Sequence, residues 1–128
     1  MDEKKVDNDI MDNAVEIILS GKIDSVNANE VEQGIRSQLE GKGQVPVILH
    51  AADLEYISSA GLRMLLHLKK AYPDITITDV SSEIYDILQM TGFTEMMKVK
   101  KAWKEISVEY KLYLLLNTVF QLNFDSIS

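Results

Sequence analysis

The residues with the greatest capacity for chemistry lie together in the segment from Tyr56 to Arg63, which reads YISSAGLR. Ser58 and Ser59 stand where a loop is expected to become a buried helix. The first backbone amides of a helix have no partners within the helix, and the helix dipole favours an anion beside them. A serine hydroxyl here can therefore cap the helix, or it can carry a phosphate that meets free donors. Because capping serines are far commoner than regulatory ones, the segment by itself favours capping.

The two small residues after the serines concern access to the hydroxyls. Ala60 and Gly61 have little or no side chain, so we expect them to leave the approach open for the active site of another protein. The segment lacks the nucleophile pattern G-x-S-x-G, and no motif places a base near Ser59. We therefore expect this chain to have no catalytic residue and not to be an enzyme.

The elements that must position this segment alternate between strands and helices. Short runs rich in Val, Ile and Leu predict strands, and apolar residues at helical spacing predict the helices between them. In chain order we expect a strand over 14–20, a turn over 21–24, a helix from Asn27 or Asn29 to Leu39, a strand over 45–49, a loop beginning at Asp53, a helix over 62–70, a strand over 75–78, a helix capped by Ser81 or Ser82, and a strand over 97–99. This alternation predicts right-handed crossovers and an α/β fold with a small mixed, largely parallel sheet.

The same periodicity predicts one hydrophobic core within residues 14–99. Its expected members are the inward-facing residues of the strands and of the two later helices: Ile17, Leu19, Val47, Leu49, Leu65, Ile75, Ile77 and Leu88.

Composition limits the classes of partner. The chain has 128 residues and a formal net charge of −7. An acidic surface repels phosphate backbones and anionic lipids, so we expect neither nucleic acid nor membrane as a partner, and a basic protein fits better. The chain has no cysteine, which excludes disulfides and thiolate metal sites. The N-terminus has no apolar stretch of the kind a signal peptide needs, and we expect a cytoplasmic protein.

Metal and cofactor motifs are also missing. The two histidines, His50 and His67, have no patterned carboxylate neighbours, and neither GxGxxG nor GxxxxGK[ST] occurs. We therefore expect no metal site and no cofactor.

The two ends of the chain differ from its middle. Residues 1–13 are polar, and residues 100–128 form a C-terminal extension of unknown role, in which the stretch 100–104 reads as helical. Tyr110 to Phe124 is strongly apolar but interrupted by Lys111 and two amides, and it is too short for a membrane span. This tail must pack on the domain, pair with another copy to make a homodimer, or remain an aggregation liability.

Three separated segments together resemble the STAS family, named after sulphate transporters and anti-sigma-factor antagonists. They are the GKID after the first strand, the stretch DLEYISSAGLRMLLHL, and the stretch ITITDVSSEIYDILQMTGFTEMMKV, and the resemblance runs from about Ala14 to Val99. It implies a small sheet with helices packed mainly on one face.

The resemblance also implies a phosphorylation-switched binding module of bacterial transcription regulation. In anti-sigma-factor antagonists, a serine at the start of the second helix is phosphorylated by a partner kinase that is itself the anti-sigma factor. The unphosphorylated form binds this kinase and frees the sigma factor, and a PP2C-type phosphatase resets the switch.

Individual roles follow from aligning the family pattern Asp-Ser-(Ser/Thr)-Gly on Gly61 and Leu62. This alignment puts the phosphorylated serine at Ser59 and the family's aspartate at Ser58, which departs from the pattern and is the second choice for modification.

Two aspartates match acidic residues of the family. Asp24 matches the one after the Gly-x-(Ile/Leu)-Asp turn, and Asp53 matches the one that opens the switch loop. For both, a turn aspartate that bonds to its own backbone is an equally good interpretation. The expected partner-binding residues are Asp24, Asp53, Ser58, Ala60, Gly61 and Arg63.

A different class of function remains open beside this one. The chain stops resembling the family near residue 100, so it could be a regulatory STAS module of a larger transporter-linked protein, or the truncated front end of a kinase-fused chain. Neighbouring genes would separate these alternatives.

Overall fold

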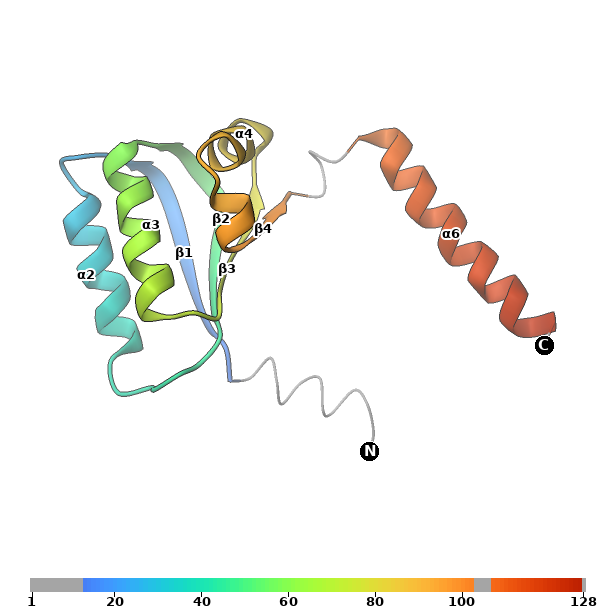
Figure 1. Ribbon diagram of the computed structural model, residues 1–128, viewed down its shortest axis with the longest axis horizontal. Coiled ribbons are helices and arrows are strands. Elements are labelled where there is room, and N and C mark those ends of the chain that lie inside the picture. Colours follow the sequence, from blue (N-terminus) through green and yellow to red (C-terminus); the bar gives the residue numbers. More distant parts are fainter. Residues whose placement is uncertain (1–12, 103–106, 128) are drawn as a thin grey trace.

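A four-stranded parallel sheet forms the centre of the protein. The computed structural model describes residues 13–102 and 107–127. Its strands are β1 (Val15–Ile23), β2 (Val47–Ile57), β3 (Ile75–Val80) and β4 (Lys98–Lys101), in the spatial order β1-β2-β3-β4. All three pairings between neighbouring strands are parallel. The predicted α/β class and the largely parallel sheet are thus confirmed (Figure 1).

Helices connect the strands and cover one face of the sheet. They are α2 (Ala28–Leu39), α3 (Ser59–Ala71), α4 (Ser82–Met90) and the short α5 (Phe93–Met96), and α6 (Val108–Ile127) follows the sheet. Along β1, Ile17 and Leu19 are buried towards the helices, whereas Ile18 between them is 71% exposed. This alternation shows that the opposite face of the sheet is uncovered by the described residues.

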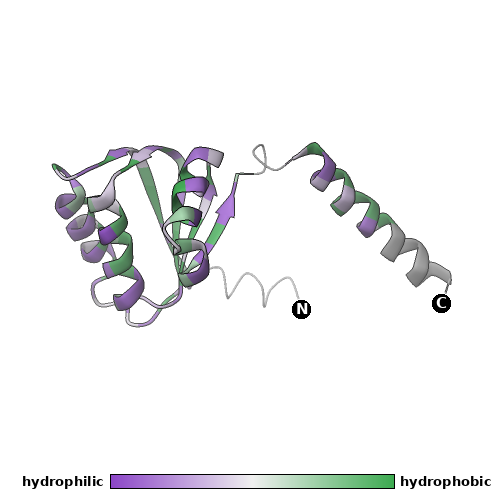
Figure 2. Cartoon of the chain, turned by 45° about the horizontal axis from the view of Figure 1, so that its top comes forward, coloured by the Kyte–Doolittle hydropathy of each residue, from purple (hydrophilic) through white to green (hydrophobic). Residues whose placement is uncertain are grey.

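The predicted core is confirmed. Each of its eight expected members is buried, and Ile23, Ile35, Leu68, Val80 and Ile84 join them. No polar or charged residue among those described is buried. The central strands are largely hydrophobic, whereas β4 and the helices, α2 above all, carry many hydrophilic residues (Figure 2). Burial of apolar surface between one sheet face and this helix layer is therefore what holds the domain together.

Two predicted boundaries were wrong, and both errors lie beside the serines. The predicted turn over 21–24 is largely strand, because β1 continues to Ile23 through two register shifts, with Gly21 at φ +67°. The second predicted strand ended at Leu49, but β2 continues to Ile57 because its backbone stays paired with the longer β1.

Later boundaries were predicted more closely. Ser81 caps α4, since its Oγ accepts a hydrogen bond from the amide of Ile84 at 3.2 Å. Gly92 at φ +84° ends this helical region and leads into α5, which was not predicted. Residues 100 and 101, predicted to be helical, belong to β4, and residues 103–106 lie outside the described part. The polar segment 1–13 lies outside it too, except for residue 13.

The C-terminal helix α6 is largely exposed. Figure 1 shows it apart from the α/β unit, and its apolar side chains Val108, Leu112, Leu115 and Leu116 are all more than half exposed. Among the described residues, no helix is long and apolar enough to cross a membrane.

Replacing Leu65 tests the core. Its side chain is 0% exposed, so Leu65→Ala should lower the free energy of unfolding by ~2–5 kcal/mol through lost contacts and a cavity. Val26→Ala is the control, because Val26 is 89% exposed, and its effect should stay within ~0.5 kcal/mol. Chemical denaturation of both variants measures the difference, and a loss below ~1 kcal/mol for Leu65→Ala would contradict this packing.

Candidate functional site

Ser58 is the N-cap of α3 and is engaged by the fold. Its backbone is extended, at φ −93° and ψ 178°, and its Oγ accepts a hydrogen bond from the amide of Gly61 at 3.4 Å. Its own amide donates to the carbonyl of Ile23 at 2.9 Å, and its carbonyl accepts from the amide of Leu62 at 2.9 Å. The side chain is half-buried, so this serine serves as the cap that the sequence favoured.

Ser59 is the first residue of α3 and is exposed. Its hydroxyl has no hydrogen-bond partner among the residues that the structure describes. The first turn of α3 contains no acidic residue, whereas α2 has Glu30 there and α4 has Glu83. The positive end of the α3 dipole is therefore uncompensated beside a free hydroxyl, which is an arrangement that tolerates an added anion.

Gly61 allows the first turn of α3 to pack closely on the sheet. A Cβ at this position would lie 2.5 Å from Cγ1 of Ile57 and 3.0 Å from Cγ2 of Ile23. The residue is itself buried. We expected Gly61 to keep the approach to the serines open, but its surroundings show that packing against β1 and β2 is what requires a glycine. Half-buried Ala60 is the small residue that lies at the surface beside Ser59.

Asp24 shapes the connection from β1 to α2. Its Oδ1 accepts hydrogen bonds from the amides of Val26 at 2.9 Å and Asn27 at 3.3 Å. The side chain of Asn27 completes the turn. Its Oδ1 accepts a hydrogen bond from the Asp24 amide at 2.9 Å, and its Nδ2 donates to the Lys22 carbonyl at 2.8 Å. The interpretation as a turn aspartate is thus correct, and Asp24 follows directly on Ile23, whose carbonyl holds Ser58.

Asp53 does not open a loop, as the sequence had suggested. It lies within β2, paired with Ser20 of β1, and it is exposed. Four residues of strand separate it from Ser58, so the fold does not bring it to the first turn of α3. A role for Asp53 in partner binding stays a prediction.

A shallow groove between α2 and α3 begins beside Ser59. Its α3 wall contains Ala60, Arg63 and His67, and its α2 wall contains Asn29 and Glu32. Arg63 is exposed, so two of the predicted partner-binding residues, Ala60 and Arg63, share this groove. The α2 wall was not predicted from the sequence. Its residues Asn29 and Glu32 are three positions apart, as Ala60 and Arg63 are on α3, so each pair lies on one face of its helix.

Glu32 links the two helices under this groove. Its Oε1 lies 3.3 Å from Nδ1 of His67, and its Oε2 accepts a hydrogen bond from Nε of Arg36 at 2.9 Å. The guanidinium of Arg36 also lies 6.0 Å from the ring centroid of Tyr72. These polar contacts connect α2 to α3 and its C-terminal end beside the groove.

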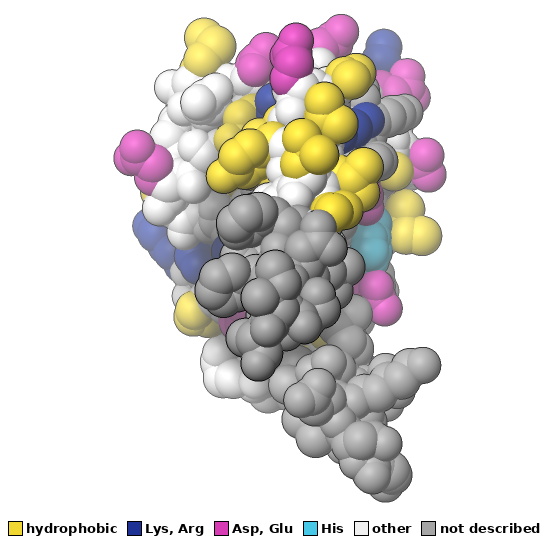
Figure 3. All heavy atoms as spheres, turned by 90° about the vertical axis from the view of Figure 1, so that its right-hand side faces the viewer, with side chains coloured by type: hydrophobic (Ala, Val, Ile, Leu, Met, Phe, Trp, Pro, Cys, Tyr) yellow, Lys and Arg dark blue, Asp and Glu magenta, His cyan; other side chains and the backbone are white. Residues whose placement is uncertain are grey.

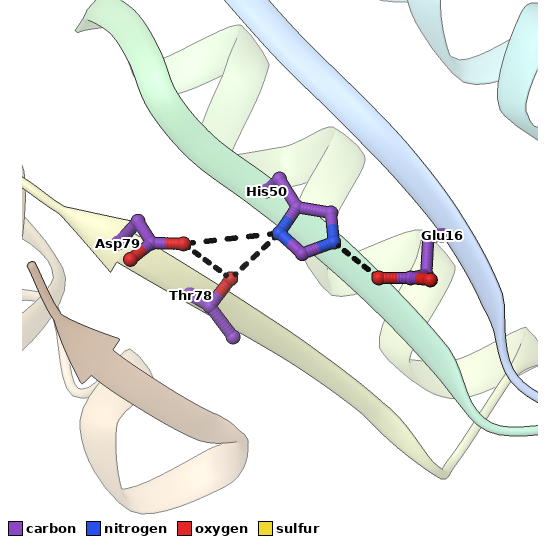
Figure 4. A network of polar contacts seen from close by, with 4 residues as sticks. All are labelled: Glu16, His50, Thr78 and Asp79. Carbon is purple, nitrogen blue, oxygen red and sulfur yellow. Dashed lines mark hydrogen bonds and ion pairs between the residues drawn. The ribbon is translucent and has the colours of Figure 1, made fainter. Parts of the chain in front are cut away.

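A second polar cluster lies on the uncovered face of the sheet (Figure 4). Nε2 of His50 lies 2.8 Å from Oε1 of Glu16, and its Nδ1 lies 3.2 Å from Oγ1 of Thr78 and 3.8 Å from Oδ2 of Asp79. The cluster joins β1, β2 and β3 on the face opposite the helices. Within residues 13–102 and 107–127, no group of three or more His, Cys, Asp or Glu side chains could hold a metal ion.

The fold and the serine pair define the class of this protein. The family model for the STAS domain matches residues 5–106, and the chain belongs to this family.

Particular relatives refine this assignment. The chain is 26% identical over 114 residues to a protein named as an anti-sigma factor antagonist, BtrV of Bordetella bronchiseptica, covering 86% of this chain and 97% of that one. A sulfate transporter family protein from Wolinella succinogenes has the same fold, with a TM-score of 0.59 and 18% identity over 80% of this chain and 88% of that one.

The close packing at Gly61 can be tested with a second glycine. Gly61→Ala should destabilise the domain by ~1–3 kcal/mol, because the new methyl group overlaps Ile57 and Ile23. Gly34→Ala is the matched control in α2, since nothing lies within 4 Å of a Cβ there, and it should stabilise the domain by ~0.5–1 kcal/mol. Thermal and chemical unfolding measure both changes in the free energy of unfolding. Changes of the same sign in the two variants would contradict the close packing at Gly61.

Proposed function

We propose that this protein is an anti-sigma-factor antagonist whose binding to a serine kinase, the anti-sigma factor, is switched off by phosphorylation of Ser59. Family membership and the name of the similar Bordetella protein support the class of function. The observation that carries the mechanism is the exposed, unbonded hydroxyl of Ser59 at the first turn of α3. The match covers 97% of the length of the similar Bordetella protein, which supports the same class of function for this chain.

Burial and hydrogen bonding favour Ser59 over Ser58 as the phosphate acceptor. The Ser58 hydroxyl caps α3 by accepting from the Gly61 amide, and a phosphate on Ser58 would disrupt this hydrogen bond. Phosphorylation requires the Ser59 oxygen to attack the terminal phosphorus of ATP while ADP leaves, and the kinase base takes the hydroxyl proton. An exposed hydroxyl on the first helical residue meets this requirement without any rearrangement of the domain.

A comparison within the chain supports the same choice. Ser81 and Ser82 repeat the arrangement at α4, with Ser81 as the cap and Ser82 as the first helical residue. Ser82 is half-buried, however, and Glu83 follows it directly. A phosphate there would be repelled by a neighbouring carboxylate, whereas Ser59 is followed by Ala60 and Gly61.

The phosphate acts on the interface rather than on the fold. It adds about −1.5 to −2 charges at pH 7, while the dipole of α3 returns only ~0.3–1 kcal/mol to an exposed anion. The domain therefore keeps its structure, and the new charge must be desolvated or mispaired against the partner. The partner surface that this account favours is the rim of the α2–α3 groove, with Asp24, Ala60 and Arg63 around Ser59.

The remaining steps belong to other proteins. The kinase supplies the phosphoryl group, and a PP2C-type phosphatase removes it by hydrolysis and returns the Ser59 hydroxyl. This chain contributes the acceptor and the binding surface, needs no cofactor, and acts in the cytoplasm of a bacterium. Its net charge of −7 suits a basic partner surface.

Charge substitutions at the two serine pairs test the switch. Ser59→Asp should weaken binding to the cognate kinase by roughly 30- to 5000-fold, the equivalent of ~2–5 kcal/mol for a mispaired buried charge. Ser59→Ala should bind like wild type and resist phosphorylation. Isothermal titration calorimetry measures both affinities, and circular dichroism checks that each variant is folded.

Ser82→Asp is the matched control, because it adds the same charge at the first residue of α4. Its affinity should stay close to that of wild type. Equal affinities for Ser59→Asp and Ser59→Ala would refute the switch, and equal weakening by Ser82→Asp would reduce the effect to general repulsion at this edge of the domain.

A further inference from the structure

The apolar face of α6 is the largest feature that the proposed switch does not explain. Val108, Leu112, Leu115 and Val119 are between 45% and 78% exposed. Figure 3 shows hydrophobic side chains gathered over the described part of α6. Exposed apolar surface of this extent marks an interaction site in a protein that remains soluble.

The spacing of these residues indicates what covers them. Val108, Leu112, Leu115 and Val119 are separated by four, three and four residues, and the sequence continues the pattern at Leu122. Alternation of three and four places apolar residues every 3.5 positions on average, which is the seam of a two-helix coiled coil. Val108, Leu112 and Leu115 also line a groove along this side of α6.

We propose that α6 pairs with α6 of a second copy of this chain, in antiparallel orientation, along this seam. A seam that repeats on one helix is complementary to itself, so two identical copies can bury it through a two-fold axis. The opposite side of the helix carries aromatic and polar residues instead. Tyr110 and Tyr113 stack there with ring centroids 6.1 Å apart, and Asn117 lies on the same side.

Register and charge favour the antiparallel orientation. When two copies of the helix run in opposite directions and cross at residue 117 of each, Leu112 lies level with Leu122 of the second copy, and Leu115 with Val119. In this register Lys111 and Asp125 of the second copy lie on the same edge of the seam, about 3 Å apart along the helix axis, which brings opposite charges together. A parallel pair would instead set each of these charges level with its own counterpart.

The pairing gives the antagonist two switch surfaces in one particle. Each copy retains its own Ser59, because α6 begins beyond the α/β unit that carries the serine. A partner with two binding sites would then engage both copies with an effective concentration set by the segment that joins α6 to β4.

Single substitutions on opposite sides of α6 test the seam. Light scattering of the full-length protein should give twice the 14.5 kDa mass of one chain. Leu115→Asp should weaken dimerisation by at least roughly 30-fold, because a carboxylate would be buried in the pair, whereas Asn117→Asp should leave it unchanged. A monomeric wild type would overturn the proposal, whether or not hydrogen exchange finds α6 protected. A dimer that survives Leu115→Asp would overturn it as well.

Cross-linking tests the orientation, since the chain has no cysteine of its own. A mixture of Leu112→Cys and Leu122→Cys chains should be joined by a short bis-maleimide. Leu112→Cys alone should not, because the two cysteines of an antiparallel pair would lie about 15 Å apart along the helices. Efficient cross-linking of Leu112→Cys alone would show a parallel pair and contradict the proposed register. Asn117→Cys, outside the seam, sets the background.

Discussion

The first turn of α3 lies against the ends of β1 and β2, and this contact determines where the two serines stand. The carbonyl of Ile23 holds the amide of Ser58 at 2.9 Å, while Gly61 brings the helix so close that a single methyl group would overlap Ile57. Because the helix starts at this fixed point, the cap falls on Ser58 and the free hydroxyl on Ser59. The Ser58 hydroxyl accepts from the Gly61 amide, and the positive end of the α3 dipole beside Ser59 has no acidic side chain in its first turn.

The fold thereby divides two chemically identical residues between two tasks. Ser58 stabilises the start of the helix. The hydroxyl of Ser59, one residue later, makes no hydrogen bond to the described residues. A side chain that makes no contact needed by the fold can gain and lose a charge without unfolding the domain, which a reversible switch requires. The groove rim beside it, with Arg63 and Ala60 on α3 and Asn29 on α2, supplies surface that a partner can read together with that charge.

The sequence predicted the parts of the fold that depend on hydrophobic periodicity. Ile17, Leu49 and Leu65 were assigned to the core because strands and helices repeat apolar residues at different periods, and all are buried. The extension of β2 to Ile57 could not be predicted in this way, because pairing with β1 rather than burial holds its polar end in the sheet. The α2 wall of the groove was missed for a related reason, since it depends on which two helices lie side by side.

The account depends on which hydroxyl receives the phosphate, and one measurement decides this directly. The purified chain is incubated with its cognate kinase and ATP, and the peptide that spans the start of α3 is sequenced by tandem mass spectrometry. The account predicts one phosphate per chain, located on Ser59, with Ser58 unmodified. Phosphate on Ser58, or on no residue of this peptide while the kinase modifies another site, would contradict it.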